Sequence, residues 1–430
     1  MKTTTARAAL APRSRPLRFV RAASLPASIL IATLGLGGCR GGAPKEEAPK
    51  NGLPESLPRA LALGLALFER SAEGKQVPQP ATAAFLVRRG GRWEYSTLRD
   101  EASNVFHKVM QLTPPGGQPG LLTLGGTAAV VKHWPKGGEA RVLWKADFGG
   151  KFSRMRDGEI ADVYGTGSPA IVVATHDQGV VATLRPDGPG EWTVSELDRE
   201  PGTFVHEVEV GDLDGDGTLE VYATPSLPNK LDGTPQPGHV VRYVPARGEG
   251  RVIVADLGDR HAKEILVADV DGDGRDELYA AVEAVSGGRV EIRRYDADTP
   301  PDAGVTIATL DDRLCRCLVY GDVDGDGRRE IVATTSKKGL WLLRPAKQAG
   351  EAWSVEQIDA ESSGFEHAAL LTDLDGDGTD ELYVASDDQG EVRRYSWKEG
   401  KPRRDAVHVY AQKLSGFTWN VTTVDASLVP

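Results

Sequence analysis

The chain has little cysteine, no excess of basic residues and no catalytic motif that stands out by its spacing. Lys and Arg total 51 against 62 Asp and Glu, so the formal net charge is −11. Without a basic domain or a known nucleic-acid-binding motif, we expect no nucleic-acid partner. The sequence also lacks His-Glu-x-x-His and Gly-x-Ser-x-Gly, the signatures of zinc metalloproteases and α/β-hydrolases. A site built from distant residues would leave no such motif, so an enzyme stays an alternative.

Cysteine occurs only at Cys39, Cys315 and Cys317. The last two are two residues apart in a predicted strand, which would place both side chains on the same face of a sheet. Such a pair can bind a metal ion or form a strained disulfide, but two small buried side chains are the simpler interpretation.

What the sequence has in abundance is a repeated acidic loop. The pattern Asp-x-Asp-Gly-Asp-Gly-x-x-Glu occurs four times, beginning at Asp212, Asp269, Asp322 and Asp373. Carboxylates at positions one, three, five and nine and a carbonyl at position seven are hard oxygen ligands, which Ca²⁺ binds at about 2.3–2.6 Å. The glycines at positions four and six let the backbone curl around one ion. Mg²⁺ fits less well because it tends to keep its waters.

Each loop supplies five candidate calcium ligands. They are Asp212, Asp214, Asp216, Thr218 and Glu220; Asp269, Asp271, Asp273, Arg275 and Glu277; Asp322, Asp324, Asp326, Arg328 and Glu330; and Asp373, Asp375, Asp377, Thr379 and Glu381. Four Ca²⁺ ions would add eight positive charges to the net charge of −11 and leave about −3. The acidity is therefore explained by metal binding and does not indicate a basic partner.

The loops open like an EF-hand but continue differently. An EF-hand has a Glu at position twelve and a helix on each side, whereas position twelve here is Ala223, Ala280, Ala333 or Val384. The residues that follow each loop are β-branched or aromatic and predict a strand. The repeated unit is therefore strand, metal-binding loop, strand. An acidic hairpin turn without a metal is the alternative.

The loops start 57, 53 and 51 residues apart, a period typical of a β-propeller or a β-solenoid. Each unit predicts four strands. The loop at Asp162 keeps the glycines but loses three of the four carboxylates, so we expect the turn without calcium. Residues 84–98 resemble the last two strands of a unit, and residues 417–425 resemble the first. The sequence thus predicts an all-β fold, a propeller of four-stranded blades whose last blade is closed by both chain ends. Seven blades are favoured, with six or eight as alternatives.

On its acidic loops and their period, the chain resembles the FG-GAP/VCBS-repeat β-propellers, a group that includes the integrin α-subunit head and many bacterial surface proteins. The resemblance covers about residues 80–430. It implies that the loops bind about four structural Ca²⁺ ions through the ligands named above. A clear Phe-Gly…Gly-Ala-Pro signature is missing, which places the chain nearer the VCBS branch. The family includes adhesins, lectins and a few enzymes, so its fold does not determine the function.

The start of the chain is typical of an export signal, with basic residues followed by the apolar run Leu25–Leu36. The sequence Leu36-Gly37-Gly38-Cys39 resembles a bacterial lipobox, which predicts lipidation of Cys39 and a lipid anchor in the membrane. An ordinary secretion signal is the alternative. No later segment predicts a membrane span. Arg40 stands where an Asp would favour the inner membrane, so the expected location is the bacterial cell envelope, at the outer membrane or cell surface.

Three domains follow from these features. They are a lipoprotein signal peptide (1–38), a tether with a short apolar segment (39–79) and the propeller (80–430). The tether is rich in Gly, Pro, Lys and Glu, as flexible linkers are. Its apolar segment, Leu61–Phe68, is expected to form a short helix against the propeller.

A candidate ligand site follows from the register of the innermost strands, which surround the central tunnel of a propeller. Basic or imidazole residues stand six positions before each acidic loop, and alignment of the weaker units adds three more residues. Together they would converge on the tunnel mouth opposite the loops and concentrate positive potential there, suiting a carboxylate, phosphate or sulfate. Pairing with neighbouring Glu residues is the structural alternative. The candidates are His107, Arg156, His206, Lys263, Arg316, His367 and Trp419.

Three functions fit these observations. The leading hypothesis is a calcium-stabilised, membrane-anchored, non-catalytic binding or adhesion module that recognises a glycan, an anionic polymer or a surface protein. The first alternative is a polysaccharide lyase or hydrolase that uses the tunnel mouth. The second is a non-catalytic scaffold in an envelope complex.

Overall fold

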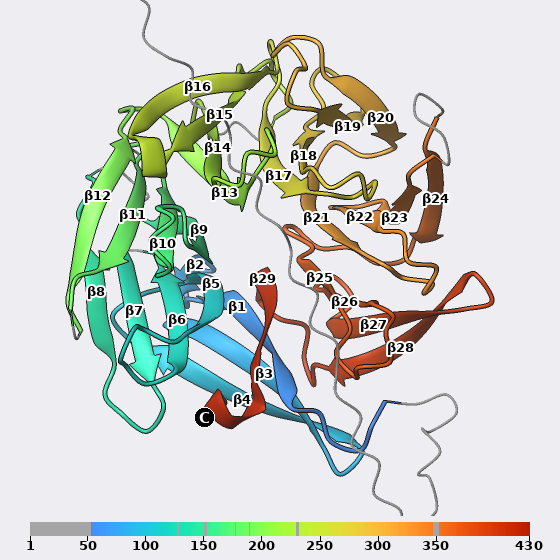
Figure 1. The fold of residues 1–430 in the computed structure, drawn as a ribbon. Coiled ribbons are helices and arrows are strands. Elements are labelled where there is room, and N and C mark those ends of the chain that lie inside the picture. The colour runs from blue at the N-terminus through green and yellow to red at the C-terminus, as the bar shows by residue number, and fades with distance from the viewer. Residues whose placement is uncertain are drawn as a thin grey trace, which may run out of the picture. The chain divides into compact units, whose positions relative to one another are not determined.

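The computed structural model describes residues 53–126, 129–149, 153–176, 178–188, 190–228, 232–346 and 352–430. This part of the chain is all β apart from two single-turn 3₁₀ helices, η1 (Pro245–Arg247) and η2 (Ala426–Leu428). Its strands form seven antiparallel sheets arranged as the blades of a β-propeller (Figure 1). The predicted fold class and the blade count of seven are confirmed. The signal peptide, Cys39 and the first part of the tether lie outside the described residues.

Six blades are continuous in sequence, and their strands pair in chain order. Blade I holds β5 (Phe106–Leu112), β6 (Gly120–Gly125), β7 (Val130–Pro135) and β8 (Arg141–Lys145). Blade II holds β9 (Met155–Ala161), β10 (Ala170–Thr175), β11 (Val181–Pro186) and β12 (Trp192–Asp198). Blade III holds β13 (Phe204–Gly211), β14 (Glu220–Ser226), β15 (His239–Val244) and β16 (Glu249–Asp256).

Blade IV holds β17 (Ala262–Ala268), β18 (Glu277–Val282), β19 (Val290–Tyr295) and β20 (Val305–Leu310). Blade V holds β21 (Cys315–Gly321), β22 (Glu330–Thr335), β23 (Gly339–Arg344) and β24 (Ser354–Asp359). Blade VI holds β25 (Ala369–Thr372), β26 (Glu381–Ser386), β27 (Glu391–Lys398) and β28 (Lys401–Val409). Each acidic loop therefore connects the innermost strand of a blade to the second.

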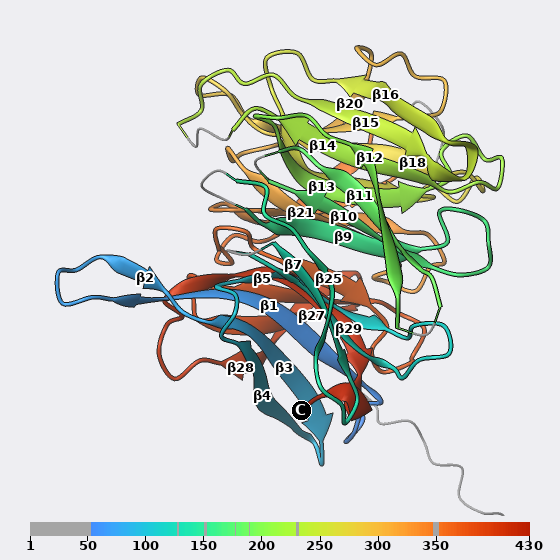
Figure 2. The same ribbon diagram turned by 90° about the vertical axis from the view of Figure 1, so that its left-hand side faces the viewer.

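Blade VII is built from both ends of the described chain, as predicted. Its innermost strand is β29 (Gly416–Asp425), which pairs with β1 (Arg59–Arg70) and places Arg59 opposite Asp425. The outer strands β3 (Ala81–Arg89) and β4 (Arg92–Asp100) follow. The short strand β2 (Gln76–Pro78) pairs with the end of β1 in a hairpin that reaches beyond the blade (Figure 2). This pairing closes the ring and removes an exposed sheet edge.

The apolar segment Leu61–Phe68 is part of strand β1, so the expected short helix is wrong. Residues of β1 alternate between two interfaces: Ala62 packs toward blade I, whereas Leu63 packs toward blade VI. A strand that is buried on both faces has a continuous apolar run, and such a run cannot be told from a buried helix by its pattern. The propeller therefore begins at β1, and the boundary predicted at residue 80 comes too late.

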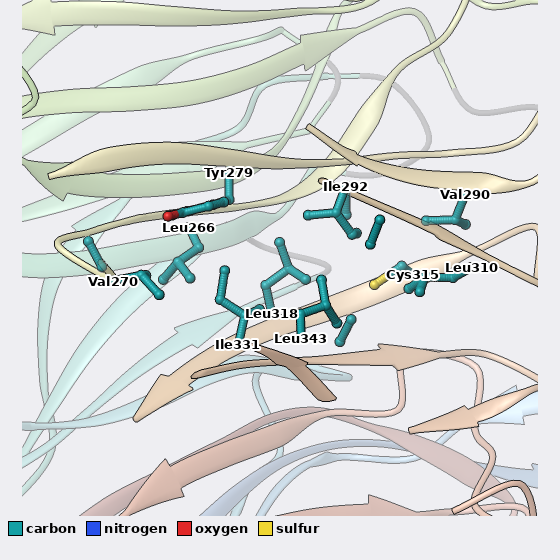
Figure 3. Close-up of a cluster of buried hydrophobic side chains, with 14 residues drawn as sticks. Leu266, Val270, Tyr279, Val290, Ile292, Leu310, Cys315, Leu318, Ile331 and Leu343 are labelled. Atoms are coloured by element: carbon teal, nitrogen blue, oxygen red, sulfur yellow. The ribbon is translucent and has the colours of Figure 1, made fainter. Parts of the chain in front are cut away.

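Hydrophobic side chains fill seven seams between neighbouring blades in the described structure. In the seam between blades IV and V, Leu266 and Tyr279 face Leu318 and Ile331 (Figure 3). Trp353 caps the outer side of this seam, with its ring centroid 5.8 Å from that of Tyr279. Because most blades pack on both sides, the core is spread around the ring.

A β-bulge interrupts the innermost strand of most blades, because the register with the second strand shifts in β5, β9, β13, β17, β21 and β29. In β21 the bulged residue is Arg316. As a result Cys315 packs into the seam with blade IV, while Cys317 packs into the seam with blade VI. The expectation that both cysteines share one face is therefore wrong, because the extra residue reverses the alternation. Both thiols are free.

Candidate metal loops and axial cavity

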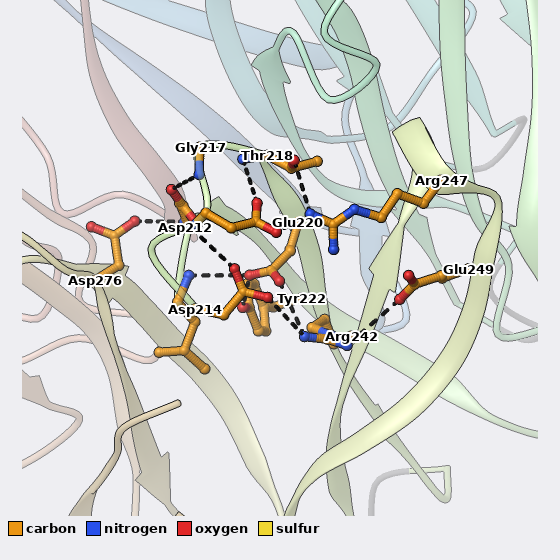
Figure 4. A network of polar contacts seen from close by, with 12 residues as sticks. Asp212, Asp214, Gly217, Thr218, Glu220, Tyr222, Arg242, Arg247, Glu249 and Asp276 are labelled. Carbon is orange, nitrogen blue, oxygen red and sulfur yellow. Dashed lines mark hydrogen bonds and ion pairs between the residues drawn. The ribbon is translucent and has the colours of Figure 1, made fainter. Parts of the chain in front are cut away.

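The four acidic loops share one backbone geometry. In the first loop, Asp212 Oδ2 accepts a hydrogen bond from Gly217 N at 2.7 Å (Figure 4), and the equivalent bonds measure 2.8–3.1 Å. Gly215 and Gly217 have φ angles of +68° and +85°, which residues with a side chain rarely adopt. The first carboxylate thus closes the turn that the two glycines permit.

The carboxylates of each loop lie close enough to share a cation. Asp269, Asp271, Asp273 and Glu277 each offer an oxygen within 4.8 Å of the others. Three carboxylates meet this criterion in each remaining loop: Asp212, Asp214 and Asp216; Asp322, Asp324 and Glu330; and Asp373, Asp375 and Asp377. The predicted carboxylate ligands outside these groups are Glu220, Asp326 and Glu381. Several hard oxygens on one flexible loop fit a divalent cation.

The ninth-position glutamates are held by protein groups as well. Glu220 is buried; its Oε2 accepts a hydrogen bond from Leu213 N at 3.1 Å and another from the Tyr222 hydroxyl. Its Oε1 accepts one from Arg242 Nη1 at 3.1 Å (Figure 4). These bonds hold Glu220 at the start of β14, and Glu277 makes the equivalent bonds with Val270 N and the Tyr279 hydroxyl.

An arginine of the third strand occupies the same place in all four loops. It pairs with the ninth-position Glu and also lies 2.7–3.9 Å from the third-position Asp. The four residues are Arg242, Arg294, Arg344 and Arg394. The sequence patterns did not point to them, although three of the four stand directly before a tyrosine.

Burial raises the pKa of Glu277, Glu330 and Glu381 to about 7. A carboxylate withdrawn from water needs positive charge beside it to remain ionised. The arginine supplies part of that charge, and a cation in the loop would supply the rest.

The seventh position of each loop contributes to the turn through its backbone N–H. Its N–H donates to the Asp carboxylate at position five over 2.8–2.9 Å. The residues concerned are Thr218, Arg275, Arg328 and Thr379. Metal ligation by their carbonyl oxygens remains a prediction.

In the last three acidic loops the eighth position links the loop to that of the preceding blade. Asp276 Oδ2 accepts a hydrogen bond from Asp212 N at 2.7 Å (Figure 4), and Asp380 Oδ2 accepts one from Asp322 N at 2.9 Å. Between them, Arg329 Nη1 donates to the carbonyl of Asp269 at 2.7 Å. The four loops therefore form one connected series, a role that the variable letters of the motif concealed.

The loop at Asp162 keeps the expected turn. Asp162 Oδ2 accepts from Gly167 N at 2.6 Å, as the first Asp does in the four acidic loops. Gly165 and Gly167 again have positive φ angles of +65° and +78°. The first Asp and the glycines alone are thus sufficient for the backbone shape.

A cavity of about 310 Å³ opens where the innermost strands start, at the end opposite the acidic loops. Four of the seven predicted ligand-binding residues line it: Arg156, His206, Arg316 and Trp419. All four lie at the bulges described above. A bulge re-aims the side chain that it carries, so the six-residue offset found in the sequence corresponds to a real feature of the strands.

The other three predicted residues do not line the cavity. His107 packs edge-on against Trp419, with 4.6 Å between ring centroids, and its Nδ1 donates to the carbonyl of Met155 at 2.8 Å. The fully buried Lys263 pairs with Glu283 at 3.5 Å.

His367 binds the Thr335 carbonyl and the Ser362 hydroxyl, each at 2.7 Å, and its φ angle is +49°. This backbone turn brings the preceding residue, Glu366, to the cavity in its place.

Glu366 lies between Arg156 and Arg316, two of the arginines that line the cavity. Its carboxylate is 3.6 Å from Arg156 Nη2 and 3.8 Å from Arg316 Nη1. The Nε of Arg316 also pairs with Glu283 at 3.0 Å. Burial alone would raise the pKa of Glu283, but Arg316 and Lys263 hold it at about 2. Burial and the nearby Arg316 lower the pKa of Lys263 to about 7.

Pairing with a neighbouring glutamate, the structural alternative, holds for Arg156 and Arg316, which both lie beside Glu366. Glu264 accepts a hydrogen bond from Leu318 N of the next blade at 2.7 Å. In the same way, Asp157 of blade II accepts a hydrogen bond from Val208 N of blade III at 3.0 Å. These carboxylates satisfy backbone groups freed by the bulges and so connect neighbouring innermost strands.

Aromatic residues form much of the cavity wall, and the sequence patterns did not single them out. Phe204, Phe365 and Phe417 each stand two residues before the bulge position or its equivalent. The hairpin of β1 and β2 adds Phe68 and Pro78. The same register that located the basic residues, moved back by two, would have found the three phenylalanines.

Among the residues that the structure describes, no helix has the length and apolar character needed to cross a membrane. No curated protein matches the chain. Two solved structures resemble it at 13% identity over 85% of its length, and they are candidate 6-phosphogluconolactonases of Bacteroides fragilis NCTC 9343 and Bacteroides uniformis ATCC 8492. Their TM-scores are 0.50 and 0.49, with 98% and 99% of those chains covered. At 13% identity the first structure supports the fold alone, and we draw no conclusion from the second.

Residues 269–333 match the FG-GAP-like repeat family. The matched segment contains the acidic loops that begin at Asp269 and Asp322, together with strands of blades IV and V. The match and the ring of seven blades together confirm the resemblance drawn from the sequence. The chain is a seven-bladed β-propeller that carries an FG-GAP-like repeat.

Proposed function

We propose that this chain is a calcium-stabilised, non-catalytic binding module of the bacterial envelope. Its recognition surface would be the mouth of the axial cavity, at the end of the innermost strands opposite the acidic loops. The observation that supports the proposal is the chemical difference between the two ends of the innermost strands. One end of these strands leads into acidic loops fit for cations, and the other opens into a cavity with arginines and aromatic rings.

Calcium is the cation that suits the loops best. Oxygen ligands dominate, and the ligand sets differ slightly from loop to loop, both of which Ca²⁺ tolerates better than Mg²⁺. The residues that would hold the four ions are the twenty named from the sequence. The ions would stabilise the propeller, since they bind the folded chain and not the unfolded one.

Display on the envelope follows from the start of the chain. A lipidated Cys39 would anchor the propeller at the outer membrane or the cell surface, with residues 40–58 as a tether. Replacement of Cys39 by Ala should release the protein from the membrane fraction. Retention of the Cys39→Ala variant in that fraction would contradict the anchor.

Binding fits the cavity better than glycoside hydrolysis does. Most glycosidases need two carboxyl groups, about 5–9.5 Å apart, on either side of the scissile bond. Among the described residues that line the cavity, Glu366 is the single carboxylate, and it is engaged by Arg156 and Arg316. This composition supports recognition of a partner at the mouth.

The test is binding of the purified full-length chain to glycans, anionic polymers and isolated envelope proteins, with Ca²⁺ and after chelation. We expect one class to bind, more weakly after chelation and fully again when Ca²⁺ is restored. A folded, calcium-loaded chain that binds none of them would contradict the proposed function.

A further inference from the structure

The axial cavity contains buried donors that the protein does not satisfy. Arg156, His206 and Arg316 are 6%, 4% and 8% exposed and line the cavity. Arg156 Nε, Arg316 Nη2 and His206 Nε2 have no hydrogen-bond partner in the described protein. A buried polar group without a partner has lost its hydrogen bonds to water and gained none from the protein. The N–H groups of Arg156 and Arg316 therefore favour a ligand that accepts hydrogen bonds, whereas His206 Nε2 donates or accepts according to its tautomer.

The charge of the cavity calls for an anion. Arg154, Arg156 and Arg316 line it against one carboxylate, Glu366. Glu366 lies 3.6 Å and 3.8 Å from Arg156 and Arg316, longer than the roughly 2.7–2.9 Å of a charge-assisted hydrogen bond. Arg316 Nε also pairs with Glu283 at 3.0 Å. Arg156 Nε and Arg316 Nη2 have no hydrogen-bond partner among the described residues, so a second carboxylate could bind to both side chains.

The rest of the wall is apolar and aromatic. The Arg156 guanidinium lies over the Trp419 ring at 4.5 Å, and Arg316 lies over the Phe365 ring at 5.4 Å. Phe204 and Phe417 also line the cavity. Arg156 and Arg316 therefore each lie beside an aromatic face, an arrangement that suits a ligand with a charged end and a flat apolar body.

The volume sets the size of the ligand. About 310 Å³ is close to the lower limit of roughly 300 Å³ for small-molecule pockets. A small ligand fits such a space, and Phe68 and Pro78 of the projecting hairpin bound it on one side.

We propose that the axial cavity binds one small aromatic carboxylate, with its carboxylate on Arg156 and Arg316 and its ring against Trp419, Phe204 and Phe417. The inference rests on the proposed binding function and names the ligand class for its site. The hydrogen bond from His107 Nδ1 to the Met155 carbonyl fixes the imidazole of His107 edge-on against Trp419. His107 therefore helps to hold Trp419 in the cavity wall.

The first experiment is calorimetric titration of the calcium-loaded full-length chain with 3-phenylpropionate, its neutral amide and glucuronate. We expect one molecule of 3-phenylpropionate per chain. The amide should bind at least about tenfold more weakly because it lacks the charge that the arginines favour. Glucuronate should also bind at least about tenfold more weakly because it lacks the apolar ring. Equal affinity for the amide would overturn the role of the arginines, and equal affinity for glucuronate would overturn the role of the aromatic wall.

Two substitutions at the site should have opposite effects. Arg156→Gln should weaken 3-phenylpropionate binding about tenfold or more. Glu366→Gln should strengthen it, because the anion that competes for both arginines is removed while the shape is kept. Glu94→Gln, at an exposed ion pair with Arg89, is the matched control and should change nothing. Weaker binding by Glu366→Gln would overturn the proposal, and this outcome stays informative if Arg156→Gln fails to fold.

The calcium-dependent shift in melting temperature reports folding separately from binding in each variant. A macromolecule that binds the calcium-loaded chain without competition from 3-phenylpropionate would overturn the cavity inference and leave the proposed function intact. An acid that binds while the macromolecule panel stays silent would support the cavity and count against the proposed recognition of an envelope partner.

Discussion

The two ends of the innermost strands differ in how strictly they repeat. Where the strands end, four loops present the same acids and glycines and make the same turn hydrogen bonds. Where they start, the bulge position and its equivalent hold His, Arg, Lys or Trp, and no two neighbouring blades use the same residue. A repeated feature does the same work in every blade, whereas a binding cavity must present different groups at different places around one ligand. Stability should therefore respond to changes in the loops, and binding to changes at the mouth.

The largest effect should come from removal of calcium, which tests the loop face as a whole. Mass action gives about 2.7 kcal/mol per site at a hundredfold excess of free Ca²⁺ over its dissociation constant. A chelator should therefore lower the melting temperature strongly, and added Ca²⁺ should restore it. The measurement is thermal unfolding with and without chelator. An unchanged melting temperature would contradict calcium binding by the loops.

Loss of a single site should have a smaller effect. Asp324→Ala removes a carboxylate from the group formed with Asp322 and Glu330, so one bound ion and about 2.7 kcal/mol of calcium stabilisation at a hundredfold excess should disappear. Calorimetry counts the ions that remain. The matched control is Asp162→Ala. Its loop makes the same turn but lacks the other three carboxylates of the pattern. Its calcium stoichiometry should stay the same, and a loss of one ion there would break the distinction between the two kinds of loop.

Loss of a link between loops should cost somewhat less. Asp276→Ala removes the carboxylate that accepts a hydrogen bond from Asp212 N at 2.7 Å. A backbone donor left without its charged partner costs about 1–3 kcal/mol. Urea unfolding in saturating Ca²⁺ measures this change directly. Asp298→Ala, at an exposed position of the loop between β19 and β20, serves as the control. Equal midpoints for the two variants would show that the link between loops contributes nothing.

The smallest effect concerns pH and the mouth. Lys263 has a pKa of about 7, lowered by burial and by Arg316, while Glu283 opposes this shift. Glu366, Arg156, His176 and His206 are its other charged or titratable neighbours. An anion favours the protonated lysine, so affinity for 3-phenylpropionate should fall as pH rises from 6 to 8, by less than about tenfold.

Titration of Lys263→Met over the same pH range provides the control for this effect. The variant should show a flatter profile than the native chain, because the group that changes charge is gone. Identical profiles for the two proteins would assign the pH dependence to another group.

Much of the fold could be read from the sequence because the loops repeat. Four loops in one register fixed the blade period, and the match of residues 84–98 with 417–425 predicted the shared blade. Strand β1 could not be read in the same way. Both of its faces are buried, so its apolar run carried no period that would separate strand from helix.

The candidate site was predicted in part, for a related reason. Counting back from the loops found Arg156, His206, Arg316 and Trp419, which line one cavity. The count did not anticipate the backbone turn at His367. Because of its positive φ angle, Glu366 lines the cavity in place of His367. The count also missed the phenylalanines and the hairpin, since contacts between distant blades leave no local pattern. The arginines beside the loops escaped notice because the connection before the third strand varies in length.

The pairing of β1 with β29 makes the two ends of the propeller sequence neighbours in one sheet, with Arg59 opposite Asp425. Ala426 N also donates to the carbonyl of Pro58 at 2.8 Å. The ring of blades is therefore closed, and the position of the chain ends in blade VII is not required by the arrangement of the sheets. A circular permutant that joins these ends through a short linker and opens the chain between two other blades would keep all seven sheets intact.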